Sequence, residues 1–109
     1  MKRGEIWTIA GGADYAGKPR PALILQDDNF ALVESITLCP LTTELEDGPD
    51  LRIAVLPTPG NGLRHESRIM TDKVTTLPRG KVGRRIGTLA IDEMEEVEMA
   101  MMIFLGLAR

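Results

Sequence analysis

An arginine held between two prolines is the first feature of this sequence that could do chemistry. Arg20 lies in the stretch KPRPALIL, residues 18–25, and an apolar run follows it at once. Each proline fixes its own φ and disfavours the α region at the residue before it, so Arg20, which precedes Pro21, is held extended. A guanidinium is always charged and can bind two phosphate oxygens as a fork. The stretch therefore suits either a phosphate-binding cation or an ordinary surface arginine at the start of a strand.

A pair of hydroxyls follows the apolar stretch SITLCPL, residues 35–41, which predicts a strand. Thr42 and Thr43 come directly after it. A threonine at a strand end commonly bonds its own backbone. The same hydroxyl could instead donate a hydrogen bond to a bound phosphate. Both interpretations stay open from the residues alone.

A third candidate group lies in SRIMTDKVTTL, which is β-branched and alternating and predicts one long strand over residues 67–77. Along such a strand Arg68 and Asp72 point to the same face, because side chains alternate with a period of two. We therefore expect a structural salt bridge between them, or an aspartate that binds strand-end amides.

The other charged and reactive groups are few. Arg79, Lys81, Arg84 and Arg85 form the one basic run, which is usually a solvated face and could also contact a phosphate backbone. His65 is the only histidine, so a mechanism with two histidines as base and acid is excluded, and we expect His65 on the surface. The single Cys39 permits no intrachain disulfide, and with one histidine a structural zinc site is not expected. We expect no metal and no cofactor.

The composition fits one globular domain over residues 1–109. The formal net charge is -3, with 43% hydrophobic and 27% charged residues, which argues against wholesale coating of nucleic acid but allows a local basic surface. No apolar stretch approaches the length of a membrane span, and the first residues have no signal-type apolar region. The sequence thus predicts a cytoplasmic protein that does not enter the membrane.

The elements that must position these groups are short strands followed by one helix. Alternation and apolar runs predict strands over residues 4–10, 22–26, 35–41, 51–57 and 67–77, with a loop or short sixth strand at the basic run. Residues 11–18 are rich in glycine, which predicts a flexible flap. The last segment has apolar residues at helical spacing, with acids on the other side: Ile91, Met94, Val97, Met101 and Phe104 or Leu105. We predict a mainly β (β-rich α+β) fold: a small, strongly bent antiparallel sheet or partly open barrel with a C-terminal amphipathic helix.

The ordered set RGEIW, KPRPALILQ, TLCPLTTE, SRIMTDKVTTLPRGKVGRRIGTL and a terminal FLGL resembles the MazF/PemK (Kid) family. The likeness covers nearly the whole chain, although no single motif in it is specific. It implies an SH3-like barrel with added helices and a homodimer. It also implies the toxin of a type II toxin–antitoxin pair, which binds a cognate antitoxin and cuts single-stranded RNA without a metal.

The resemblance also implies roles for individual residues. Arg20 matches the arginine of the family's RP motif, which acts in catalysis. Thr42 matches the catalytic threonine or serine, with Thr43 as second choice. In some relatives an aspartate at the position of Asp72 and an arginine just before it act as base and acid. In this chain Ile69 and Met70 occupy the upstream positions, and the nearest arginine is Arg68.

Further residues are assigned more loosely. Asp72 and Lys18 are, with Arg68, further candidates for catalysis or RNA binding. The basic run of residues 79–85 would contact the RNA backbone or the antitoxin. The histidine that some relatives carry in the early loop is missing, so the general base stays open.

Two alternatives remain at this point. Gyrase poisons of the CcdB type share the fold but bind a protein and cut nothing; this chain has the RP loop and lacks their Trp-Gly-Ile ending. The second alternative is a catalytically inactive homologue that only binds an antitoxin.

Overall fold

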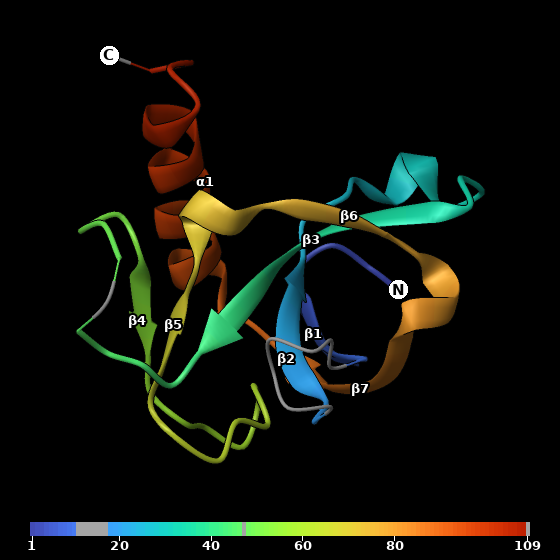
Figure 1. The fold of residues 1–109 in the computed structure, drawn as a ribbon, viewed down its shortest axis with the longest axis horizontal. Helices are drawn as coiled ribbons and strands as arrows, with labels where there is room; N and C mark the ends of the chain where they lie inside the picture. Colours follow the sequence, from blue (N-terminus) through green and yellow to red (C-terminus); the bar gives the residue numbers. More distant parts are fainter. Residues whose placement is uncertain (11–17, 47, 109) are drawn as a thin grey trace.

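A computed structural model describes residues 1–10, 18–46 and 48–108. Within these residues the chain forms a seven-stranded antiparallel sheet and one α-helix, so the mainly β prediction is confirmed (Figure 1). The predicted flap lies almost wholly outside the described residues. The elements are β1 Glu5–Ile9, β2 Arg20–Ile24, β3 Ser35–Thr42, β4 Ile53–Val55, β5 Ser67–Ile69, β6 Thr75–Pro78, β7 Val82–Thr88 and α1 Ile91–Phe104.

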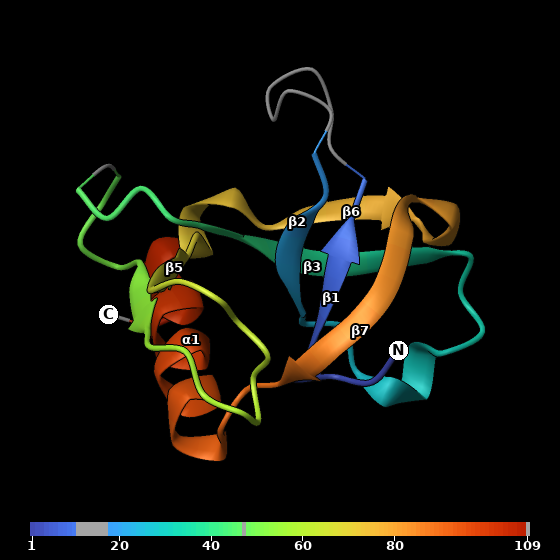
Figure 2. The same cartoon turned by 90° about the horizontal axis from the view of Figure 1, so that it is seen from below.

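The long strand β3 lies at the centre of the sheet, whose order is β4-β5-β3-β2-β1-β7 with β6 also beside β3. One edge of β3 pairs with β2, and the other pairs with β6 over residues 35–38 and with β5 at Leu41 and Thr42. The sheet curls around itself into a half-barrel, and α1 stands beside β4 and β5 (Figure 2). The predicted bent sheet followed by a helix is therefore what forms.

The predicted single strand over residues 67–77 is wrong, because a 3-10 turn at Thr71–Lys73 separates β5 from β6. Tertiary hydrogen bonds stabilise this break. The Met70 N–H donates to the Pro40 carbonyl at 2.9 Å, and the Thr71 hydroxyl donates to the Leu51 carbonyl at 2.9 Å. Alternation continues on both sides of the turn, which is why the sequence pattern does not reveal it.

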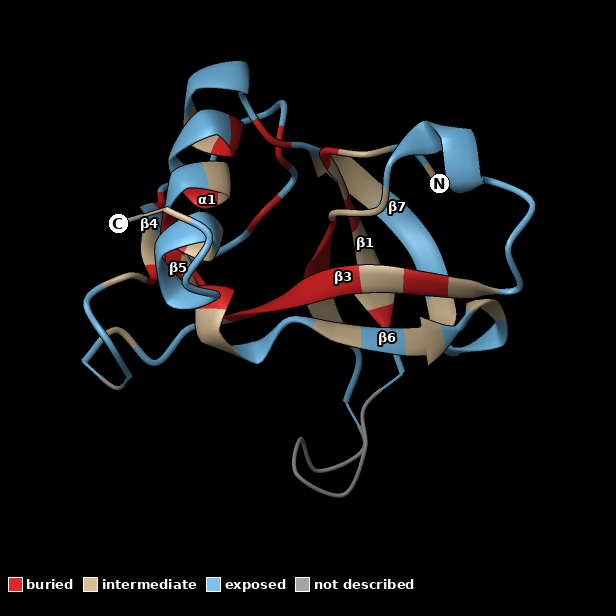
Figure 3. Cartoon of the chain, turned by 90° about the horizontal axis from the view of Figure 1, so that it is seen from above, coloured by how far each residue is buried: buried red, intermediate tan, exposed pale blue. Residues whose placement is uncertain are grey.

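Two apolar clusters fill the two faces of the curled sheet. The first lies between the sheet and α1 and includes Leu23, Cys39, Leu41 and Ile69. The second lies inside the curl; it comprises Ile9, Ala22, Ile24, Ile36 and Leu38. Because successive strand residues alternate between the faces, neighbours in β2 and β3 contribute to opposite clusters. Most of β3 is buried as a result (Figure 3).

The terminal helix is confirmed, but its predicted apolar stripe is buried only in the middle. Met94 and Val97 belong to the first cluster, and Ala100 is buried as well. Ile91, the first residue of the helix, is 81% exposed, and Leu105, just after its last residue, is 58% exposed. The apolar stripe therefore shows which side of the helix faces the core. It does not show how much of the helix length the core covers.

Candidate functional site

A lateral row of polar side chains crosses the sheet where β2 begins and β3 ends. Thr42 of β3 pairs with Arg68 of β5. The β2–β3 register pairs Ala22 with Pro40, and continuing it by two residues places Arg20 opposite Thr42. The arginine at the RP motif, the first threonine and the arginine of β5 thus align across three strands. We call Arg20, Thr42 and Arg68 the arginine–threonine row.

The row lies on the face of the sheet away from α1. Arg20 pairs with Ile9 across β1 and β2, and Ile9 belongs to the cluster inside the curl. Leu41 and Ile69, which neighbour Thr42 and Arg68, belong to the cluster under α1, so the row points the other way. Two cations and one hydroxyl in such a row suit the binding of a single phosphate group.

The hydroxyl of Thr42 is oriented by its own backbone. Its oxygen accepts a hydrogen bond from the Glu44 N–H at 3.1 Å, the local turn expected for a threonine at a strand end. This contact uses the oxygen as acceptor and leaves the hydroxyl proton able to donate elsewhere. The turn interpretation is therefore confirmed, and it is compatible with a role in phosphate binding.

Arg68 carries an unusual group. Its Nε is buried and has no hydrogen-bond partner among the residues that the structure describes. A buried guanidinium N–H without an acceptor is costly, and a ligand oxygen would remove that cost. Arg68 therefore has a donor to offer at the row.

Asp72 does not pair with Arg68, so the predicted salt bridge is wrong. Its carboxylate binds Arg52 at two points, Nε to Oδ1 at 2.8 Å and Nη2 to Oδ2 at 3.0 Å. The guanidinium of Arg52 holds the pKa of Asp72 below its ordinary value, although burial acts against this. Asp72 lies in the 3-10 turn instead of a strand, so the same-face rule does not apply to it. Nothing in the alternating pattern around Arg52 marks it as the partner.

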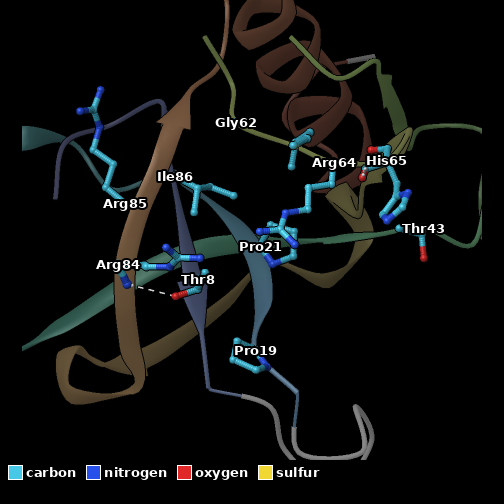
Figure 4. Close-up of a pocket in the computed structure, with 12 residues that line it drawn as sticks. Thr8, Pro19, Pro21, Thr43, Gly62, Arg64, His65, Arg84, Arg85 and Ile86 are labelled. Atoms are coloured by element: carbon cyan, nitrogen blue, oxygen red, sulfur yellow. Dashed lines mark hydrogen bonds between the residues drawn. The ribbon is translucent and has the colours of Figure 1, made fainter. Parts of the chain in front are cut away.

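A pocket of about 610 Å³ opens on the other face, beside the strands that carry the row (Figure 4). It brings together residues from β1, β2, β7 and the segment before β5, including a histidine and arginines. The lining comprises Thr8, Pro19, Pro21, Thr43, Gly62, Leu63, Arg64, His65, Ser67, Arg84, Arg85 and Ile86. No sequence pattern marks Arg64, and His65 is predicted only as a surface residue; His65 is exposed and also lines this pocket.

The two threonines are separated by the structure. Thr42 belongs to the arginine–threonine row, whereas Thr43 is exposed and lines the pocket. The choice between Thr42 and Thr43 as the catalytic threonine is thus a choice between the arginine–threonine row and the pocket.

The members of the predicted basic run make different contacts. The Arg79 guanidinium donates to the Val33 carbonyl at 2.6 Å, which ties it to the segment before β3. Arg85 forms an ion pair with Glu5 at 3.0 Å and donates to Thr88. Lys81 and Arg84 are exposed, and only Arg84 and Arg85 of the run line the pocket. Lys18 is exposed two residues before β2 begins.

Cys39 is not a candidate nucleophile. It is buried, its thiol donates to the Met70 carbonyl at 2.8 Å, and burial raises its pKa to about 12. The thiolate is the reactive form, so this thiol is inert at neutral pH.

Among the residues that the structure describes, no three histidine, cysteine, aspartate or glutamate side chains are grouped so that they could hold a metal ion. Within the same residues, no helix is long and apolar enough to cross a membrane.

Known proteins similar to this chain point in one direction. The family model described as PemK-like, MazF-like toxin of type II toxin–antitoxin system matches residues 2–105. A protein of Mycolicibacterium smegmatis named probable endoribonuclease MazF is 48% identical over 108 residues, 99% of each chain. The solved Mycobacterium tuberculosis toxin MazF-mt6 is 25% identical, with a TM-score of 0.80 over 96% of this chain and 99% of that one.

Other solved structures share the fold at lower identity. An endoribonuclease of a mycobacterial species, in complex with its cognate antitoxin, superposes with a TM-score of 0.82 at 20% identity, covering 100% and 98% of the two chains. A MazE–MazF complex from Deinococcus radiodurans gives 0.79 at 18% identity, covering 99% and 97%.

Proposed function

Because this chain belongs to the PemK-like, MazF-like toxins of type II toxin–antitoxin systems, we propose that it is an endoribonuclease that cuts single-stranded RNA at the arginine–threonine row. The alignment of Arg20 with Thr42 and Arg68 carries this proposal. These three side chains supply positive charge and a hydroxyl donor where one phosphate can be held. The gyrase-poison alternative is not favoured, since the relative at 48% identity is named an endoribonuclease.

The reaction is an attack of the 2′-OH on the adjacent phosphate. The bond from the 2′-oxygen to phosphorus forms, and the bond from phosphorus to the 5′-oxygen breaks. The 2′-OH loses its proton to solvent water and the leaving 5′-oxygen takes one from solvent water, which gives a 2′,3′-cyclic phosphate and a 5′-OH end. Negative charge builds on the phosphate oxygens in the transition state, and preorganised donors stabilise that charge best.

Each member of the row has a distinct part in this scheme. Arg20 stabilises the charged phosphorane and donates a hydrogen bond to the leaving 5′-oxygen, while its own guanidinium stays charged. Thr42 donates its hydroxyl proton to a phosphate oxygen, since its own oxygen is already oriented by Glu44. The buried Nε of Arg68 donates to the same phosphate. Asp72 is not assigned as the base, because its carboxylate is bound at two points by Arg52.

The scheme needs no metal ion, because guanidinium groups supply the positive charge at the phosphate. The protein acts as a homodimer in the cytoplasm, where a groove across the two-fold axis accepts extruded single-stranded bases. Its partner is a cognate antitoxin, as in the MazE–MazF complex of Deinococcus radiodurans.

The deciding experiment uses a long RNA of defined sequence in EDTA, with cut sites mapped by sequencing 5′-OH ends. We expect discrete cuts from the wild type and a loss of nearly all cleavage from Arg20→Ala. Lys2→Ala, an exposed cation at the N-terminus, is the matched control and is expected to cut at the wild-type rate. Wild-type cleavage by folded, dimeric Arg20→Ala would overturn the assignment.

A further inference from the structure

The pocket on the face opposite the row has the composition of a nucleotide site. Its lining includes arginine and histidine side chains and no aspartate or glutamate, with all twelve lining residues in the described part of the chain. Its volume of about 610 Å³ lies within the range of small-molecule sites, which runs from roughly 300 to 1,000 Å³. A ligand with negative charge and a flat apolar face fits this lining.

Two of the arginines are available to a ligand. The side chains of Arg64 and Arg84 make no hydrogen bond or ion pair with any residue that the structure describes, and both are exposed. They extend into the pocket from opposite walls, whereas Arg85 points away from both (Figure 4). Arg85 is engaged by Glu5 and Thr88. The pocket thus holds a pair of unengaged guanidiniums, which can share one phosphate.

The walls that carry these arginines are built tightly. At Gly62, with φ of +70°, a Cβ would lie 1.9 Å from the Ile86 carbonyl oxygen, and at Gly87 it would lie 2.3 Å from the Asn61 backbone. Asn61 is 2% exposed, and its side chain accepts from the N–H groups of Thr58 and Leu63 and donates to the Leu56 carbonyl. The segment before Arg64 is therefore packed directly on β7, and the pocket is preformed.

The remaining lining offers surfaces for a base and a sugar. Pro21, Leu63 and Ile86 contribute apolar surface to the same pocket. The oxygen of Thr8 accepts from the Arg84 N–H at 3.0 Å, so its hydroxyl proton is directed elsewhere. A flat base can pack on the apolar residues while a hydroxyl contacts its edge or the sugar.

The pocket is linked by sequence to the arginine–threonine row. Pro19 and Pro21 flank Arg20, Thr43 follows Thr42, and Ser67 precedes Arg68. Adjacent strand residues face opposite sides of a sheet, so the row and the pocket lie on two sides of the same three strands. Arg20 begins β2 and Thr42 ends β3, so one RNA strand can pass over these ends from the row to the pocket.

We propose that this pocket is a second nucleotide subsite, which holds one RNA nucleotide near the scissile phosphate, with its own phosphate between Arg64 and Arg84. Its base packs against Pro21, Leu63 and Ile86. The proposal rests on the proposed RNA cleavage for the identity of the ligand, but occupancy of the pocket does not require cleavage. Arg64 and Arg84 are thus binding residues for the substrate, distinct from the row that acts on the reacting phosphate.

The direct test is a titration of ¹⁵N-labelled full-length protein with adenosine 5′-monophosphate and uridine 5′-monophosphate at millimolar concentration. Saturable shifts are expected at the amides of Gly62, Leu63 and Ile86, and they are expected to vanish in the double variant Arg64→Ala/Arg84→Ala. The absence of saturable shifts with both nucleotides, or shifts unchanged in the double variant, would overturn the proposal. A glutamate oligopeptide that shifts the same amides at lower concentration than either nucleotide would reassign the pocket to an acidic peptide and would also overturn it.

A second measurement uses a fluorescent 2′-O-methyl RNA, which cannot be cut by 2′-OH attack. Arg64→Ala/Arg84→Ala is expected to bind it about tenfold or more weakly. Loss of one phosphate contact should lower the slope of log K against log salt by about 0.7. The matched control Lys2→Ala/Lys73→Ala removes two exposed charges outside the pocket. An equal loss in the control would assign the effect to net charge and reject the subsite.

Failure of this proposal and failure of the proposed function give different results. Amide shifts in a wild type that cuts no RNA would keep the pocket as a nucleotide site and reject the nuclease. Cleavage by the wild type without any shift would keep the nuclease and reject the pocket. Both double variants must show the wild-type melting temperature, and the substituted side chains are exposed, so folding is expected to be unaffected.

Discussion

The guanidinium of Arg52 and the carboxylate of Asp72 form a two-point ion pair beneath the segment that follows β3, with side chains only 6% and 14% exposed. Gly48 lies directly against this guanidinium, where a Cβ would fall 2.2 Å from its Cζ. The Thr71 hydroxyl adds a bond to the Leu51 carbonyl. The ion pair therefore holds the segment that runs from Thr42 to Arg52 against the turn between β5 and β6.

Asp72→Asn is expected to destabilise the protein by about 3 kcal/mol, because it leaves the buried Arg52 without its counter-charge. Urea unfolding at pH 7, followed by Trp7 fluorescence, measures this loss. The double variant Arg52→Met/Asp72→Leu is the control and should recover much of the stability, since it buries no unpaired charge. A wild-type midpoint for Asp72→Asn would show that the ion pair contributes nothing.

The same pair predicts a direction of pH dependence. The pKa of Asp72 is lowered in the folded state, so the folded state holds this proton less tightly than the unfolded state does. Its contribution is complete above the ordinary aspartate pKa and is lost as pH falls through the lower folded value. Wild type and Asp72→Asn should therefore converge in stability on acidification below about pH 4. A difference between them that stays constant down to pH 2 would contradict this.

Thr42 and Thr43 are expected to affect different kinetic constants. Thr42→Val removes a donor to the reacting phosphate and should lower kcat by about tenfold to a hundredfold with KM little changed. Thr43→Val alters the pocket lining and should raise KM with kcat little changed. Thr42→Ser keeps the hydroxyl and should restore kcat, which separates loss of the hydroxyl group from loss of the β-branched methyl group. The reverse pattern would exchange the roles of the two threonines.

Gly87→Ala tests how tightly the pocket wall is built. The added methyl would meet the Asn61 backbone at 2.3 Å, and we expect a loss of about 2 kcal/mol or more together with weaker RNA binding. Gly80→Ala is the matched control, since its Cβ meets nothing within 4 Å. Thermal melts and anisotropy with the 2′-O-methyl RNA measure the two effects. Equal melting temperatures for the two variants would mean that the pocket wall can shift to accommodate the added methyl group.

Cys39 should resist alkylation until the protein unfolds. Its buried thiol has a pKa of about 12, so almost no thiolate exists at pH 8. Mass spectrometry after iodoacetamide treatment should show an unmodified native chain and a fully modified chain in urea. Rapid labelling of the native protein would show that β3 opens locally.

Much of the fold follows from local patterns. Met94 and Val97 are buried because apolar residues recur at helical spacing, and that spacing is visible in the chain itself. The strands around residues 4–10 and 35–41 follow in the same way from alternation and apolar runs. The stiff backbone at Arg20 is also local, since the prolines on either side impose it. Periodicity does not show where the core ends: Ile91 and Leu105 continue the apolar spacing but are exposed.

The sequence by itself determined that short strands precede one terminal helix, and it singled out the two candidates Arg20 and Thr42. Only the tertiary structure decided which groups meet. Asp72 binds Arg52 instead of Arg68 because a turn held by distant carbonyls breaks the strand between them. Arg64 and Arg84, twenty positions apart, enter one pocket because glycines let their two segments touch. The physical reason is that strand pairing and close packing join residues by their positions in space, which no local pattern of residue types encodes.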